Sequence, residues 1–230
     1  MIATPDRAAA YDPHCTRCRR LAAFLRKTRA RHPDYWARPV PSFGARQPRI
    51  LVVGLAPGLH GANRTGRPFT GDHAGFLLYA TLYEAGLASA PLSQSAHDRL
   101  RLLNARIANA VKCVPPANRP LPREVRRCNP YLASELRRLR EVRVYLALGR
   151  VAHDAVLMAL GLQRARYPFA HAREHALDAA RWLIDSYHCS RYNTATRRLT
   201  PQMFRAVMAR VCERAGLPAP RGWRVVRRAD

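Results

Sequence analysis

The sequence predicts an α/β protein: one domain of three layers, α/β/α, around a central, mostly parallel sheet of four strands. Four short apolar runs, each ending in polar residues or glycine, are typical of buried parallel strands. Segments with apolar residues at every third or fourth position lie between these runs and indicate helices. Because strands and helices alternate, we expect a doubly wound sheet with its binding site at the carboxyl ends of the strands.

The order of elements follows from these patterns. The expected strands are the runs at residues 49–57, 105–113, 142–149 and 181–188. The expected helices cover residues 15–31, 72–86, 123–139, 149–161 and 200–216. Asp72 stands at the start of the second helix, where a capping side chain is favoured, and Gly86 stands at its end. We expect the glycine-rich stretch at 58–71 to be a loop.

The composition is that of a globular chain. Of 230 residues, 48% are hydrophobic and 24% charged, which excludes disordered, collagen-like and coiled-coil proteins. No run approaches the roughly 18 apolar residues of a membrane helix, and the first residues lack the apolar core of a signal peptide. We therefore expect a cytoplasmic protein in which residues 1–230 form a single domain with a basic tail at about 217–230.

The chain is strongly basic. Forty Lys and Arg residues against fifteen Asp and Glu give a net charge of +25, and only Lys27 and Lys112 are lysines. A polyanion is the expected partner, which in a prokaryote would associate the protein with the nucleoid. The alternative is a solvated surface whose arginines reflect GC-rich coding.

Six cysteines lie in a chain without a secretory signal, so metal or cluster ligation is favoured over disulfides. Cys15 and Cys18 form a CxxC motif, and Cys113 and Cys128 lie near the end of the second strand and in the helix that follows. On spacing alone, four thiolates suit an iron-sulfur cluster or zinc equally well. We expect the remaining two to be a loop thiol, Cys189, and a residue of a core helix, Cys212.

A loop of unusual composition joins the first strand to the second helix. Its sequence, GLAPGLHGANRTGRPFTGD, places five glycines where backbone amides and a helix N-terminus accept anions. It has neither the Lys-Ser/Thr pair of a Walker loop nor the GxGxxG spacing of a dinucleotide fold.

Together with the KC pair at 112–113 and the later YHCSRYNTATRRLT, this loop resembles the motifs of the uracil-DNA glycosylase superfamily, and most closely those of its family 5, the iron-sulfur type. The resemblance spans about residues 15–204. It implies a monofunctional enzyme that hydrolyses the N-glycosidic bond of uracil in DNA, as the first step of base-excision repair. It also implies tolerance of other deaminated bases such as hypoxanthine, and a [4Fe-4S] cluster held by the four cysteines Cys15, Cys18, Cys113 and Cys128.

The resemblance also assigns a base-binding site. Phe69 would stack on the extruded base, Asn109 would read its Watson–Crick edge, and Gly54 and Ala56 would line the same pocket. The alternative for Phe69 is packing beneath the following helix. An Asn in an apolar strand is costly without a partner, which favours a functional role for Asn109.

Three residues are the candidates for catalysis. His188 would stabilise negative charge on uracil O2 as the glycosidic bond breaks. The first motif lacks a carboxylate or amide to activate water, so Asp72 would polarise the water or stabilise the sugar cation, unless it serves only as a helix cap. His60 is a second candidate for ordering the water. Cys189 replaces the proline that usually follows the histidine, which puts the rigidity of the loop in doubt.

The expected partner is uracil-containing DNA, in double- and single-stranded form, bound by a monomer. The residues expected to contact the strand are Arg64, Arg67, Ser190, Asn193 and Arg197, with Arg191 and Arg198 as further backbone clamps. Arg197 and Leu199 are expected to fill the space left by the base.

Two other function classes remain open on the sequence. One is a catalytically inactive iron-sulfur module that binds nucleic acid, and the other is a zinc-dependent hydrolase of small nucleotides.

Overall fold

The computed structural model describes residues 11–218, 220 and 223, which contribute to one six-stranded sheet with the order β1-β3-β2-β4-β6-β5. The strands are β1 (Phe43–Gly44), β2 (Ile50–Gly54), β3 (Ala105–Asn109), β4 (Val144–Leu148), β5 (Glu174–Ala176) and β6 (Trp182–Ser186). The four central strands, β3, β2, β4 and β6, are parallel, and the two edge strands pair antiparallel to them. The α/β class is therefore confirmed, whereas the expected number of four strands was wrong. The two edge strands have only two and three residues, too few to show a periodic pattern.

The helices are α1 (Arg19–Arg31), α2 (Ala62–Thr65), α3 (His73–Glu84), α4 (Pro122–Arg138), α5 (Arg150–Leu160), α6 (Arg191–Ala195) and α7 (Pro201–Arg214). Short 3-10 turns span Pro116–Asn118 and Arg164–Arg166. Five of these helices lie where the apolar periodicity predicts them. The two others, α2 and α6, have four and five residues and lie in segments expected to be loops.

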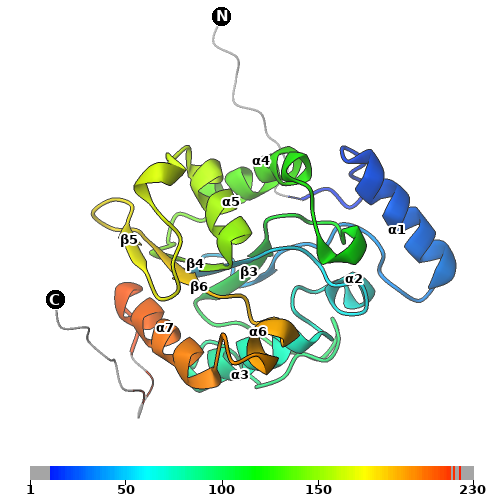
Figure 1. Cartoon of the computed structure of the whole chain (residues 1–230). Coiled ribbons are helices and arrows are strands. Elements are labelled where there is room, and N and C mark those ends of the chain that lie inside the picture. Colours follow the sequence, from blue (N-terminus) through cyan, green and yellow to red (C-terminus); the bar gives the residue numbers. More distant parts are fainter. Residues whose placement is uncertain (1–10, 219, 221–222, 224–230) are drawn as a thin grey trace, which may run out of the picture.

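The sheet is covered on both faces (Figure 1). Alternate residues of β2 point to opposite sides: Ile50 and Val52 pack in the cluster that contains α3 and α7, while Leu51 and Val53 pack with α1, α4 and α5. Every residue of β2 and β4 is buried, which explains their uninterrupted apolar sequences.

The parallel strands bring the loops that follow them to one edge of the sheet. The ladder continues past β2 and β3, where the N–H of Ala110 donates to the carbonyl of Gly54 and that of Val111 donates to Leu55. The residues after β2 and β3 are thereby held side by side, and the residues after β6 start from the same edge of the sheet.

Among the described residues, no helix has the length and apolar character to cross a bilayer. Most of the basic tail expected at about 217–230 lies outside the residues that the structure describes.

Candidate active site

Side chains from three separate segments meet at the carboxyl edge of the sheet. A Cβ atom placed on Gly54 would lie 2.6 Å from Asn109 Oδ1 and 2.6 Å from the Phe69 ring. The rings of Phe69 and His188 stack, with their centroids 5.8 Å apart and their planes 29° from parallel. Gly54, Phe69, Asn109 and His188 therefore line one site, and Gly54 has no side chain because there is no room for one.

Asn109 ends β3 with its side chain buried, 3% exposed. Its Oδ1 atom has no hydrogen-bond partner within the described structure. A buried acceptor without a donor costs about 1–3 kcal/mol, so such atoms are rare outside functional sites. Asn109 therefore presents an acceptor that only a ligand or a water molecule can satisfy.

Phe69 is held in an unusual backbone conformation. Its φ of 56° is in the left-handed region, which is strained for an aromatic residue. The helix α3 passes so close that a Cβ on Gly75 would lie 1.8 Å from the Phe69 carbonyl oxygen. The preceding residue is fixed by Tyr79, whose hydroxyl donates to the Pro68 carbonyl at 2.8 Å. These contacts orient the Phe69 ring toward Gly54. Phe69 therefore lines the site and also packs beneath α3.

His188 follows β6 and is partly exposed. Burial lowers the pKa of its imidazole to about 4, so the ring is neutral at neutral pH. The Nδ2 of Asn193 donates to the His188 carbonyl at 2.8 Å, and the Ser190 hydroxyl accepts from the Asn193 amide at 3.4 Å as the N-cap of α6. Ser190 and Asn193 thus order the loop behind the histidine, and Cys189 is completely buried beneath it.

Asp72 lies at the start of α3, as expected, and caps that helix. Its Oδ1 accepts from the Gly75 amide at 3.1 Å, while its Oδ2 is 2.5 Å from the position that a Cβ on Gly61 would take. Burial raises the pKa of this carboxyl, although hydrogen bonds from the amides of Gly75, Ala62 and Ala74 oppose the rise. The pKa of Cys189, the residue after His188, is raised mainly by burial and to a lesser extent by the negative charge of Asp72.

Two expected site residues have other roles. Arg67 is only 6% exposed, and its guanidinium donates to Asp98, Ser93 and the Ala96 carbonyl. It ties down the loop before β3, so its guanidinium is already engaged within the protein and nothing in the structure supports the expected DNA contact. Leu199 is fully buried in the core and cannot fill a gap in DNA.

His60 lies on the surface, and Tyr35 OH and His60 Nδ1 are 2.8 Å apart in a hydrogen bond. Among the described residues no hydrogen bond joins it to Asp72, and its role in ordering water stays a prediction. Four of the arginines expected to contact DNA are exposed: Arg64, Arg191, Arg197 and Arg198.

The four expected cluster ligands converge at a second place. Cys15, Cys18, Cys113 and Cys128 line one cavity between α1, α4 and residues 111–113. The Lys112 amide donates to Cys128 Sγ at 3.3 Å. Four thiols that line one cavity are a suitable donor set for an iron-sulfur cluster or for zinc.

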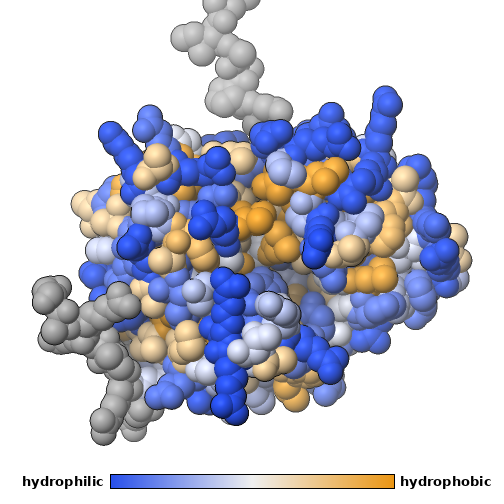
Figure 2. All heavy atoms as spheres, viewed as in Figure 1, coloured by the Kyte–Doolittle hydropathy of each residue, from blue (hydrophilic) through white to orange (hydrophobic). Residues whose placement is uncertain are grey.

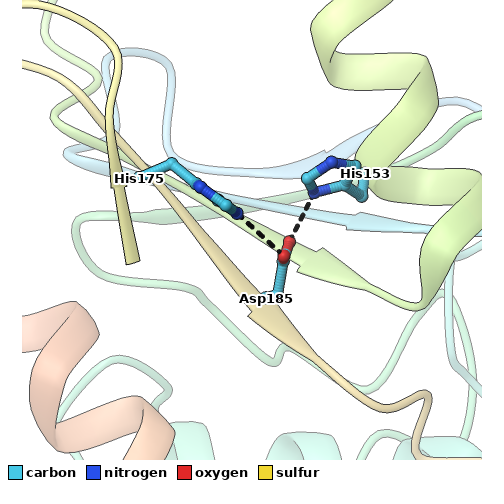
Figure 3. A group of neighbouring side chains, drawn as sticks. All are labelled: His153, His175 and Asp185. Atoms are coloured by element: carbon cyan, nitrogen blue, oxygen red, sulfur yellow. Dashed lines mark hydrogen bonds and ion pairs between the residues drawn. The ribbon is translucent and has the colours of Figure 1, made fainter. Parts of the chain in front are cut away.

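A third group of polar side chains lies away from both sites. His153 of α5 and His175 of β5 point at Asp185 of β6, with nitrogen–oxygen distances of 2.7 and 3.2 Å (Figure 3). The other ring nitrogen of His153 is 2.8 Å from the Tyr167 carbonyl. All three residues are buried, and the carboxylate joins the edge strand to α5.

Comparison with known proteins identifies the family of this chain. The family model of the uracil DNA glycosylase superfamily matches residues 41–212. A type-5 uracil-DNA glycosylase of Thermus thermophilus is 50% identical over 208 residues, which cover 88% of this chain and 94% of the relative. The chain belongs to the uracil-DNA glycosylase superfamily, in its type-5 branch. A second type-5 uracil-DNA glycosylase, of Pyrobaculum aerophilum, is 41% identical over 88% of this chain and 90% of its own length.

The type-4 branch is less similar. The type-4 uracil-DNA glycosylase of Archaeoglobus fulgidus is 35% identical over 125 residues, 54% of this chain and 55% of the relative. A uracil-DNA glycosylase hydrolyses the N-glycosidic bond of uracil in DNA.

Sequence reasoning missed one exposed side chain beside this pocket. Tyr192 of α6 is 70% exposed, more than any other large apolar or aromatic side chain of the described residues. The sequence does contain a signal for this residue: Tyr192 is an aromatic residue four positions after His188, with Arg191 before it and Arg197 after it.

Proposed function

We propose that this pocket removes uracil from DNA by hydrolysis of its N-glycosidic bond, leaving an abasic site. The observation that carries the proposal is the unpaired, buried Oδ1 of Asn109 beside the stacked rings of Phe69 and His188. Uracil has a flat ring that can stack on Phe69 and an N3–H group that can donate a hydrogen bond to Asn109 Oδ1. Extruding the base costs a few kcal/mol, which stacking and this hydrogen bond offset.

The chemical steps follow from the protonation states. The bond between C1′ and N1 breaks, and its electron pair goes to the uracil ring, where the charge spreads to O2. A neutral His188 donates one N–H to that oxygen and stabilises the leaving anion. Water then adds to the sugar cation at C1′ and gives one proton to the Asp72 carboxylate, which leaves a hydroxyl on the sugar. Asp72 releases this proton to solvent, and the uracil anion takes up a proton from solvent after it leaves.

A Schiff-base route is not supported by the lysine near the site. The Lys112 ammonium is buried and lies 2.8 Å from the Ser42 hydroxyl and 3.4 Å from Glu135. Both contacts engage the amino group of Lys112 away from the pocket, which supports a monofunctional enzyme.

The experiment that tests the function uses duplexes with uracil, hypoxanthine or xanthine, followed by alkali. Strand cleavage at the position of the damaged base shows excision. Tight binding without cleavage would instead indicate the inactive nucleic-acid-binding module. The same bases in single strands determine whether a duplex is required.

The pH dependence of excision is a sharp test of this mechanism. Because the pKa of Asp72 is raised and its active form is the carboxylate, the rate should fall as the pH drops through that raised pKa. His188 stays neutral above about pH 4, so it adds no step between about pH 6 and 9. Any fall in the single-turnover rate on a uracil duplex as the pH is lowered should therefore come from protonation of Asp72. A rate that rises from pH 8 to about pH 5.5 would mean that an imidazolium is the active form.

Tyr192 is the side chain that we expect to enter the duplex. The face drawn in Figure 2 is hollowed near its centre, and α6, which carries Tyr192, lies below this hollow (Figure 1). An aromatic ring in the stack replaces the extruded base, and one such contact contributes about 1–3 kcal/mol. Tyr192→Ala should therefore lower kcat/KM on duplex uracil by about 5- to 150-fold, whereas excision from single strands should change less than about twofold. Equal losses on both substrates would contradict this role.

We also propose that Cys15, Cys18, Cys113 and Cys128 hold a [4Fe-4S] cluster. Their shared cavity and the resemblance to the iron-sulfur type of the family support this assignment. The cluster would supply a covalent tie between the N-terminal segment and the loop after β3, since hydrolysis needs no electron transfer.

A [4Fe-4S] cluster would give the protein a visible absorbance and a defined iron content. Freshly prepared protein should be brown, absorb at about 400 nm and contain about four iron atoms per chain. Cys113→Ser should lose most of the iron and melt at a lower temperature, while Cys212→Ser, a change at a core cysteine outside the cavity, should keep the iron. Stoichiometric zinc without visible absorbance would contradict the cluster.

A further inference from the structure

A groove beside the cysteine cavity is lined by five arginines: Arg17, Arg19, Arg20, Arg123 and Arg127. It lies where the start of α1 meets the start of α4, and these two helices are neighbours at the upper right of Figure 1. Strongly hydrophilic side chains project from this part of the surface in Figure 2. We refer to it as the arginine groove.

The arginine groove carries a large excess of positive charge. Its one acidic residue, Glu124, is engaged by Arg20, whose Nε and Nη2 donate to the two carboxylate oxygens at 2.8 and 2.6 Å. The remaining four arginines are exposed and make no salt bridge within the described residues. Like charges this close repel one another, and a bound anion would remove the penalty.

Fold stability does not account for these cations. Arg19, Arg20 and Arg123 occupy the first turns of α1 and α4, where a cation opposes the helix dipole and costs about 0.3–1 kcal/mol. Arg17 packs its guanidinium 4.9 Å from the Tyr131 ring centroid, and Arg127 donates to the Arg17 carbonyl at 3.4 Å. These contacts position the side chains without neutralising their charge.

The arginine groove is close to the base-binding pocket. Asn109 and Cys113 are four residues apart, which is at most about 14 Å of chain. Cys113 and Cys18 line the same cavity, and Cys18 also lines the groove. The groove therefore opens within about one helical turn of duplex DNA, about 34 Å, from the nucleotide in the pocket.

We propose that the arginine groove binds the phosphate backbone of the duplex that flanks the extruded base. The proposal rests on the uracil excision proposed above, because the pocket determines where the duplex lies. Guanidinium groups pair with phosphate oxygens through two hydrogen bonds and release the counterions that DNA holds. The contact anchors the strand outside the pocket and reads no sequence.

The test is a triple variant, Arg17→Ala, Arg123→Ala and Arg127→Ala, bound to duplexes that contain a stable abasic analogue. On a duplex of about 30 base pairs, the slope of log K against log salt should fall by up to about 2.7, since each phosphate contact contributes about 0.9. Kd should rise about ten- to a hundredfold at 0.1 M salt. On a duplex of about 8 base pairs, which extends only about 14 Å to either side of a central lesion, the loss of affinity should be smaller than on the longer duplex.

A matched control variant also removes three arginines, but from the surface at the other end of α4. Arg137 near the end of α4, and Arg140 and Arg143 before β4, are exposed and lie toward the amino edge of the sheet, away from the pocket. The triple variant Arg137→Ala, Arg140→Ala and Arg143→Ala should keep the salt slope of the unchanged protein. Equal effects of both triple variants, or no effect of either, would overturn the proposal.

Two further measurements separate the alternatives. Iron content and absorbance should be the same in the groove variant and the unchanged protein; their loss would show that these arginines maintain the cysteine cavity instead, and would overturn the proposal. Single-turnover excision at saturating enzyme should also be unchanged. If the unchanged protein binds with the expected slope but excises no uracil, the proposed function fails while the arginine groove stands.

Discussion

Replacing His188 with alanine is expected to lower the single-turnover rate of uracil excision by about 10²–10³-fold, with a change in Kd for the substrate of less than about threefold. The imidazole is neutral, since burial lowers its pKa to about 4, and it contributes one preformed N–H to the site. A donor of this kind acts on charge that appears only in the transition state, so its loss lowers the rate and leaves ground-state binding intact.

A second substitution separates hydrogen bonding from packing. His188→Gln keeps an N–H donor and should recover about a tenth or more of the lost rate, whereas His188→Phe fills the space beside Phe69 without a donor and should be as slow as alanine. If His188→Phe excised uracil nearly as fast as the unchanged protein, the ring would serve as a wall of the pocket and not as a donor. Thermal melting of each variant checks that the fold is retained.

The long buried elements were predictable from the sequence, and the reason is physical. The residues of β2 and β4 are buried on both faces, so their apolar runs cannot be mistaken for amphipathic surface strands. The strand β1 and the helix α2 are too short to leave a periodic pattern, and a glycine stands at each end of α2. Short elements depend on neighbours that only the folded chain provides.

The sites show a similar division. A motif places Phe69, Asp72 and His188 on the correct loops, because strand ends and helix starts determine where a loop lies. It does not determine where a side chain points. Arg67 turns inward to Asp98, and Leu199 packs in the core, although both lie in motifs expected to contact DNA.

The replacement of proline by Cys189 was expected to loosen the loop after His188. The structure holds this loop by other means. Cys189 is fully buried, the Asn193 side chain donates to the His188 carbonyl, and the Thr194 amide donates to the Ser190 carbonyl at 3.0 Å. Local hydrogen bonds therefore supply the rigidity that a proline would give through its fixed φ.

Asn109 offers the clearest separation of function from stability, because the two are expected to move independently. Asn109→Leu should lower kcat/KM on uracil duplex by about 10²–10³-fold, since a buried side chain that cannot accept a hydrogen bond leaves the base N3–H unpaired. The free energy of unfolding should stay within about 1 kcal/mol of the unchanged protein, because leucine has a similar volume and removes the buried Oδ1 that has no partner.

The comparison with Asn109→Asp completes the argument. A carboxylate at this position is buried beside Phe69 and Gly54 with no cation to pair with it among the described residues, so this variant should unfold about 3 kcal/mol more easily as well as lose uracil excision. Chemical denaturation and single-turnover rates on the same preparations measure both effects. If Asn109→Leu were as unstable as Asn109→Asp while its folded fraction still excised uracil, Asn109 would be a scaffold residue, and the acceptor for the base would have to come from the backbone of the loop after β2.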